Sequence, residues 1–196
     1  GGRIMKHPLT SPMRSALIAV AFLQSLVLGW MVFDRVSLLS NGREIKAAVV
    51  PVDPRDIFRG DYVTLGYGFS TGAELALPEG VRQGDTVYAL LKSNGPTDWT
   101  LAAVSEAEPD VSGDGQVVLK AIVDYVRRSP QPGVSTVGRL RYGIERFYVP
   151  EGTGRELEAQ VREKLIVAVL AVGSNGKVAL KGLEADGKRI AEEPLL

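Results

Sequence analysis

One uncharged apolar stretch constrains this chain more than any other feature. Residues 15–33 are SALIAVAFLQSLVLGWMVF, interrupted only by one glutamine and two serines. About 20 such residues span the hydrocarbon core of a bilayer as a helix. Lys6 and Arg14 precede the stretch, and the charges of Asp34 and Arg35 cancel after it. Because positive flanks stay in the cytoplasm, we expect the N-terminus inside and the rest of the chain outside.

A cleaved signal peptide has the same polarity, but its apolar region is followed by small residues. Here Trp30, Met31 and Phe33 occupy that zone. We therefore expect an uncleaved signal anchor. The expected division of the chain is a cytoplasmic segment at 1–14, a transmembrane anchor at 15–35, a linker or helix extension at 36–46, and an extracytoplasmic β-rich domain at 47–196.

Composition excludes several functional classes. The chain has no cysteine, which excludes disulfide scaffolds, thiolate metal sites and cysteine nucleophiles. Its one histidine, His7, precedes the anchor, so the outer domain has no His-based triad. A formal net charge of +0 gives no basic surface for nucleic acid. We expect no nucleic-acid partner, no metal site, no cofactor and no catalytic residue, although the sequence does not decide whether the protein is an enzyme.

Beyond the anchor, short runs with a β pattern alternate with glycine and proline. The expected strands are Glu44–Val50, Tyr62–Tyr67, Thr86–Lys92, Thr100–Val104, Gln116–Arg127, Arg139–Tyr148, Lys164–Val172 and Lys177–Leu183. Thr153–Arg162 is typical of a helix that Thr153 caps. Gly173-Ser174-Asn175-Gly176 predicts a hairpin between the last two strands. The predicted fold is β-rich, all-β or α+β: an antiparallel β-barrel or sandwich with one short helix.

Residues 50–67, VPVDPRDIFRGDYVTLGY, combine rigidity with charge. Pro51 and Pro54 bar a regular helix, so we expect an extended loop that enters a strand. Its charges alternate in sign and suit either an ion-pair network or a binding surface. In the strand that follows, alternation places Val63, Leu65 and Tyr67 on one apolar face.

Within this segment, Gly60, Asp61, Tyr62, Leu65 and Tyr67 occupy every position of the pattern that names the GDYXXLXY family. The chain resembles this family of bacterial membrane-anchored proteins. Residues 142–152, YGIERFYVPEG, and the ending with Lys181-Gly182-Leu183 are similar to the family as well. The resemblance implies a single-pass protein of the bacterial inner membrane, linked to multi-pass membrane proteins. It implies no activity.

Three motifs suggest chemistry but have simpler explanations. Residues 110–115, DVSGDG, are similar to the opening of a calcium loop, but Ala121 stands where a bidentate glutamate is required. We expect a polar hairpin loop there. The tripeptide Arg59-Gly60-Asp61 is an adhesion signal, and here it is part of the longer motif. A Ser–Lys hydrolase needs a serine between the anchor and Tyr62, where only Ser37 and Ser40 of the linker stand.

These observations predict an accessory or interaction subunit whose periplasmic domain binds an integral membrane protein or a periplasmic component. The alternative is a carboxylate-based enzyme or a cation-binding or ligand-binding domain, built from Asp53, Asp56, Asp61, Glu145 and Glu151. We expect two contact surfaces, one within residues 51–67 and one within residues 142–151. The candidate partner-binding residues are Asp53, Arg55, Asp56, Arg59, Asp61, Tyr62, Tyr67, Tyr142, Arg146, Tyr148 and Glu151.

Overall fold

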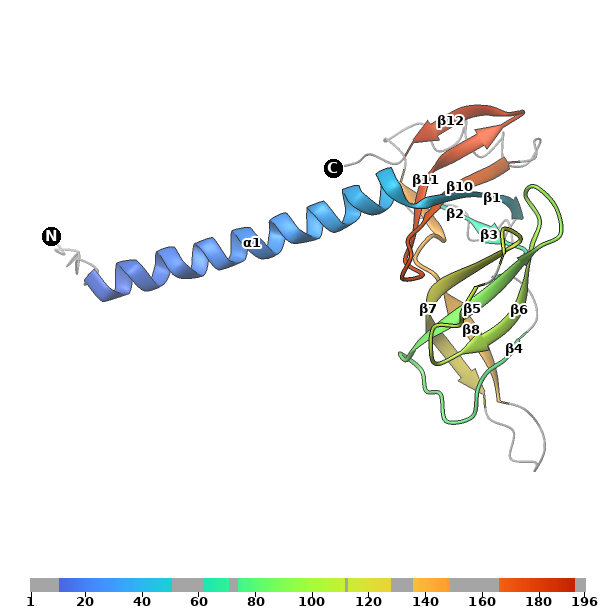
Figure 1. Ribbon diagram of the computed structural model, residues 1–196, viewed down its shortest axis with the longest axis horizontal. Helices are drawn as coiled ribbons and strands as arrows, with labels where there is room; N and C mark the ends of the chain where they lie inside the picture. The colour runs from blue at the N-terminus through green and yellow to red at the C-terminus, as the bar shows by residue number, and fades with distance from the viewer. Residues whose placement is uncertain are drawn as a thin grey trace, which may run out of the picture.

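A long helix precedes the strands of the β-rich domain. The computed structural model describes residues 11–50, 62–70, 74–111, 113–127, 136–148 and 166–192. The helix α1 spans Ser11–Asn41, and Figure 1 shows it projecting away from the strands. Its large apolar side chains are exposed between Met13 and Phe33, and the part from Ser15 onward is long and apolar enough to cross a membrane. Solvent-exposed apolar residues all around a helix are typical of one that meets lipid.

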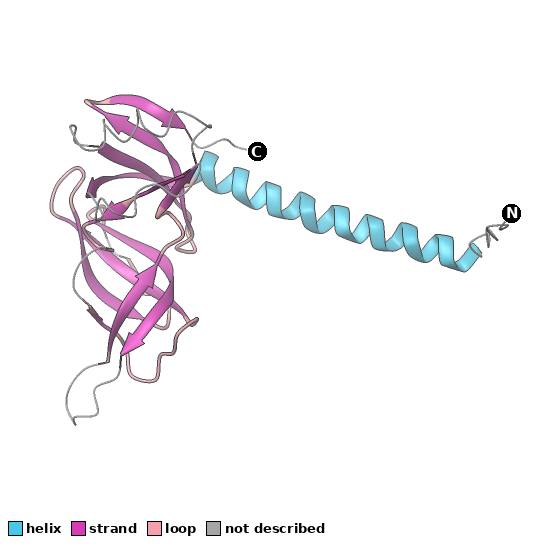
Figure 2. Ribbon diagram, turned by 180° about the vertical axis from the view of Figure 1, so that it is seen from behind, coloured by secondary structure: helices cyan, strands magenta, loops and turns pink. Residues whose placement is uncertain are grey.

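Strands account for the regular structure after α1 in the described part of the chain. They are β1 Arg43–Val50, β2 Tyr62–Thr64, β3 Gly66–Tyr67, β4 Leu75–Ala76, β5 Thr86–Ser93, β6 Trp99–Ser105, β7 Gln116–Arg127, β8 Val137–Arg141, β9 Arg146–Tyr148, β10 Ile166–Val172, β11 Val178–Ala185 and β12 Lys188–Glu192. Figure 2 shows them gathered at one end of the helix.

The strands form two five-stranded sheets and a short ribbon, all antiparallel. The sheet orders are β12-β11-β10-β1-β3 and β4-β8-β7-β5-β6, and the ribbon pairs β2 with β9. Backbone hydrogen bonds join each sheet to a loop of the other, from Ala48 N to Thr97 O in the β5–β6 loop (2.8 Å) and from Lys120 N to Gly176 O in the β10–β11 loop (2.7 Å). Both sheets contribute to one hydrophobic core. The predicted antiparallel, barrel-like β fold is therefore confirmed.

Most predicted strands are confirmed, and two of them are each divided. The strand predicted at Tyr62–Tyr67 is interrupted at Leu65, whose backbone N–H bonds to Glu145 O (2.8 Å) instead of a ladder partner. The strand predicted at Arg139–Tyr148 is interrupted by a turn in which Gly143 has φ 81°. The short strands β4 and β12 were not predicted. The predicted helix Thr153–Arg162 lies outside the described residues.

The predicted hairpin between β10 and β11 is confirmed, since Gly173 N donates to Lys177 O (2.8 Å) and Gly176 has φ 74°. The hairpin loop predicted at residues 110–115 is wrong. Strands β6 and β7 do not pair with each other but flank β5, where Tyr88 lies opposite Ser105 on one side and Lys120 on the other. The connection therefore crosses β5. Chain order alone does not reveal this arrangement.

The helix continues into the domain through the first part of the expected linker. It ends at Asn41, and β1 begins only two residues later, at Arg43. Leu39 is 3% exposed, and Lys177 Nζ of the β10–β11 hairpin lies 2.8 Å from Asp34 Oδ2. At Gly42, an added Cβ would lie 2.5 Å from Leu38 O. This close approach explains the glycine and fixes the angle between helix and strand.

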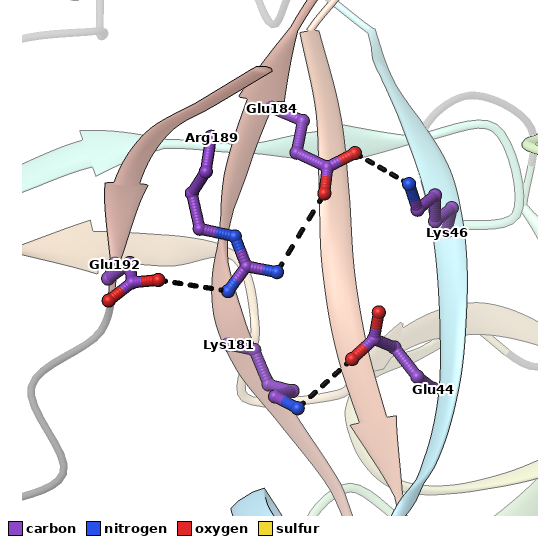
Figure 3. Close-up of polar contacts among 6 residues, drawn as sticks. All are labelled: Glu44, Lys46, Lys181, Glu184, Arg189 and Glu192. Carbon is purple, nitrogen blue, oxygen red and sulfur yellow. Dashed lines mark hydrogen bonds and ion pairs between the residues drawn. The ribbon is translucent and has the colours of Figure 1, made fainter. Parts of the chain in front are cut away.

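Ion pairs cross the outer face of the first sheet (Figure 3). Lys46 Nζ on β1 lies 2.7 Å from Glu184 Oε2 on β11, and Lys181 Nζ on β11 lies 3.0 Å from Glu44 Oε2 on β1. Both pairs join β1 to β11 across the strand between them, β10. Arg189 on β12 adds a second cation to Glu184, at 3.7 Å.

Candidate functional site

The ribbon of β2 and β9 brings together the two sequence motifs. Tyr62 lies opposite Tyr148, Val63 opposite Phe147, and Thr64 opposite Arg146. The strand of the GDY motif and the segment from residue 142 to 148 are therefore neighbours in space. The sequence placed both motifs among the contact surfaces but contained no signal for their pairing.

The last two named residues of the motif hold the turn before β9 in place. Leu65 N donates to Glu145 O (2.8 Å), and the hydroxyl of Tyr67 donates to Ile144 O (2.8 Å). Leu65 and Tyr67 are 1% and 0% exposed. The Tyr67 ring stacks on Phe69, with 5.3 Å between the ring centroids. These residues are structural, and they place β9 beside β2.

Glu145 closes the same turn with its carboxylate. One oxygen accepts the backbone N–H of Tyr142, and the other accepts that of Gly143 (2.8 Å). A carboxylate that accepts two backbone N–H bonds stabilises a turn that would otherwise leave both donors without a partner. Glu145 therefore has a structural function in this turn, which the sequence did not indicate when it offered Glu145 as a possible acid or base.

Two tyrosines lie beside this carboxylate inside the core. Burial, and secondarily the negative charge of Glu145, raises the pKa of both Tyr67 and Tyr142 above the ordinary tyrosine range. Both phenols are therefore neutral at physiological pH. The hydroxyl of Tyr142 is buried and has no hydrogen-bond partner among the described residues, while its ring meets Phe69 edge-on at 5.3 Å.

The structure corrects two of the predicted contact residues. Tyr67 and Tyr142 belong to the core, 0% and 6% exposed, so their side chains do not reach a partner. Both continue the alternation of a strand: Tyr67 follows the buried Leu65, and Tyr142 follows the buried Leu140. Of the other predicted contact residues, Arg146 and Tyr148 are exposed, and Tyr62 is described only by its backbone pairing. Outside the described residues lie Asp53, Arg55, Asp56, Arg59, Asp61 and Glu151.

The family of the chain follows from the motif and its surroundings. The profile of the GDYXXLXY protein family matches residues 24–183, which include the end of the helix, strands β1 to β10 and most of β11. The chain belongs to this family. No curated protein and no solved structure shows significant similarity to it. In this GDYXXLXY protein, the final Leu and Tyr of the motif hold the turn at residues 142–145 and position the exposed residues of β9.

Two hollows flank the point where α1 of this GDYXXLXY protein enters the domain. One, of about 560 Å³, lies between the helix end, the β10–β11 hairpin and the start of β7. The other, of about 380 Å³, lies between the helix and strands β5, β7 and β8. Asp34, Leu38 and Lys177 line both hollows. The two hollows therefore share one wall, the contact between the helix and the hairpin.

The second hollow is the more strongly charged. Its lining includes four basic side chains and one acidic side chain, Asp34. The basic residues are Arg35, Lys120, Arg141 and Lys177. Sequence reasoning did not find this site, because the four residues come from four separate elements. Among the described residues, no group of three or more histidine, aspartate and glutamate side chains is arranged to hold a metal ion.

Proposed function

We propose that this protein is a single-pass accessory subunit of the bacterial cytoplasmic membrane, with its N-terminus in the cytoplasm. In this proposal the periplasmic β-domain binds an integral membrane protein or another component of a periplasmic complex. The observation that carries the proposal is the short junction between an apolar helix and the β-domain, in which β1 begins two residues after α1 ends.

The junction supports a positioning function over a simple tether. Helix α1 continues to Asn41, and β1 follows after Gly42 alone. The buried Leu39 and the contact between Asp34 and Lys177 fix the helix against the domain. A protein that needs only to be retained at the membrane works with a flexible linker. A rigid connection instead holds one face of the domain at a set height above the bilayer, where a membrane-embedded partner can meet it.

The β2–β9 ribbon is the contact surface in this proposal. Tyr148 is 60% exposed, and Arg146, two residues earlier, points to the same side of β9. Tyrosine and arginine are enriched among the residues that anchor protein interfaces. The ribbon is held in place by the buried residues Leu65 and Tyr67, so the exposed pair is presented on a fixed backbone.

The test is affinity purification of the tagged full-length protein from native membranes in mild detergent. We expect a partner to co-purify in a fixed ratio with the wild type. The double variant Arg146→Ala/Tyr148→Ala should co-purify with much less of that partner, because the substitutions remove the two exposed side chains that anchor the interface. Tyr125 and Arg139 form an equivalent exposed pair across β7 and β8, so Tyr125→Ala/Arg139→Ala is the matched control.

The control variant should retain the partner at the wild-type ratio. Equal capture by all three proteins would exclude the ribbon as the contact surface. Extraction with alkaline carbonate tests the anchor separately, because an integral protein stays in the membrane fraction. Release of the intact protein into the soluble fraction would contradict the anchor itself.

A further inference from the structure

We propose that the basic hollow beside α1 binds the phosphate group of an anionic lipid in the outer face of the membrane, and so orients the β-domain on the bilayer. This inference rests on the proposed anchor and orientation, and it does not depend on the proposed protein partner. The site consists of Arg35, Lys120, Arg141 and Lys177 around the helix end.

The position of the hollow along the helix matches the depth of lipid headgroups. Asp34 and Arg35 directly follow Phe33, the last residue of the apolar stretch. At 1.5 Å per residue, the lining residues Asp34 to Leu38 cover about 6 Å of helix. The headgroup layer on each side of a bilayer is about 5–7 Å thick. The hollow therefore begins where the hydrocarbon core ends.

The domain also faces the bilayer on the correct side. Figure 1 shows that the sheet containing β5, β6, β7 and β8 extends to one side of the helix axis, whereas β1 continues roughly in the direction of the helix. Residues of β7 and β8 line the hollow together with Asp34, Arg35 and Leu38 of the helix. Lys120 belongs to β7, and Arg141 ends the neighbouring strand β8. Their side of the domain is therefore turned back toward the membrane surface.

The basic side chains that line the hollow outnumber the acidic ones. Lys177 is engaged by Asp34, and Arg141 lies 3.8 Å from Asp124 at a contact in which both side chains are about half exposed. Lys120 has no ion pair with any described residue. With four basic side chains against one acidic side chain in the lining, the hollow attracts anions.

Apolar side chains favour a lipid over a free phosphate. Ile122 is 42% exposed and lines the same hollow, together with Leu38 and Val178. Exposed isoleucine next to lysine and arginine is suited to an amphipathic ligand, whose phosphate meets the cations while its glycerol and upper acyl carbons meet the apolar side chains. A small inorganic anion leaves the apolar part of the hollow unused.

Native mass spectrometry of the detergent-solubilised full-length protein provides the test. The probes are phosphatidylglycerol and phosphatidylcholine with identical acyl chains, each titrated separately, and inorganic phosphate as a competitor. We expect the wild type to bind phosphatidylglycerol more tightly than phosphatidylcholine. In Lys120→Ala/Arg141→Ala this preference should fall about 25- to 30-fold, because each basic residue near an anionic surface contributes about a fivefold factor.

The matched control is Lys92→Ala/Lys188→Ala, which removes two exposed lysines that line neither hollow. It should keep the wild-type preference. An unchanged preference in Lys120→Ala/Arg141→Ala, or an equal loss in the control, would overturn the proposed site. Displacement of the lipid by millimolar inorganic phosphate would overturn the lipid as the ligand. Because no partner protein is present, failure here leaves the partner-capture result unaffected, and a failed capture leaves this result unaffected.

Discussion

The hydroxyl of Tyr67 and the carbonyl oxygen of Ile144 lie 2.8 Å apart and form a buried hydrogen bond. The bond ties the last residue of the GDYXXLXY motif to the turn that precedes β9. Tyr142 lies in the same core, but its hydroxyl has no partner among the described residues. One substitution, tyrosine to phenylalanine, should therefore have different effects on stability at these two positions.

Tyr67→Phe should lower the free energy of unfolding by about 1–3 kcal/mol. The substitution removes a buried donor and leaves Ile144 O without the hydrogen bond that Tyr67 provides. Chemical denaturation of the full-length protein in detergent, followed by tyrosine and tryptophan fluorescence, measures the change.

Tyr142→Phe should leave the free energy of unfolding unchanged or raise it by up to about 1 kcal/mol. It removes a buried hydroxyl that makes no hydrogen bond with the described residues, and it keeps the ring that contacts Phe69. The same denaturation experiment compares both variants. A loss at Tyr142 as large as that at Tyr67 would contradict the difference in hydrogen bonding.

Alkaline pH should destabilise the protein through these tyrosines. In the folded state the pKa of each is raised, first by burial and then by the charge of Glu145. The unfolded tyrosine ionises near pH 10, so the unfolded state gains stability above that pH while the folded state does not. Stability is therefore full below about pH 10 and falls above it, by about 1.4 kcal/mol per pH unit for each tyrosine.

The contribution of one tyrosine can be isolated by comparing proteins. Above pH 10, the unfolding free energy of Tyr142→Phe should fall less steeply with pH than that of the wild type. The slopes should differ by about 1.4 kcal/mol per pH unit, which corresponds to one proton. Lysines also titrate in this range, but they are common to both proteins and cancel in the difference. Identical slopes for the two proteins would show that Tyr142 ionises in the folded state as easily as in the unfolded state.

Local patterns predicted the strands well because each strand carries its own alternation. Gln116–Arg127 was predicted with its observed bounds, and the glycine-rich turn before Lys177 was identified from residue types alone. The order of the strands within the sheets was harder to predict. Tyr88 on β5 lies between Ser105 and Lys120, so β6 and β7 flank β5, and nothing in residues 106–115 distinguishes that crossover from a hairpin.

The candidate sites were also less predictable than the strands, because they depend on contacts between elements that are distant in the sequence. Tyr67 and Tyr142 were predicted as partner-binding residues, although each continues an alternation that leads into the core. The basic hollow joins Arg35 of the helix to Lys120 and Arg141 of the second sheet. No short motif records contacts between elements so far apart in the chain. The sequence does show that one of these cations, Arg35, stands two residues after the apolar stretch.

Gly42→Ala should loosen the junction between helix and domain. An added Cβ would lie 2.5 Å from Leu38 O and 3.1 Å from Ala171 Cβ, so the backbone has to shift. We expect a loss of about 1–3 kcal/mol in unfolding free energy and faster hydrogen exchange at the start of β1. Gly29→Ala is the matched control, since a Cβ at Gly29 meets no described atom within 4 Å. Equal behaviour of the two variants would mean that the junction tolerates the added methyl.

Glu184→Gln should weaken the first sheet more than Glu192→Gln does. The side chain of Glu184 is 13% exposed and lies between Lys46 and Arg189 (Figure 3). That of Glu192 is 71% exposed and, among the described residues, pairs with Arg189. Removing the less exposed charge leaves two cations without their shared anion, which should cost about 1 kcal/mol, against close to zero at Glu192. Thermal unfolding at low salt measures the difference. Adding about 1 M salt should narrow it, because screening weakens the ion pairs that the wild type retains. A difference that does not respond to salt would point to packing around Glu184 and not to its charge.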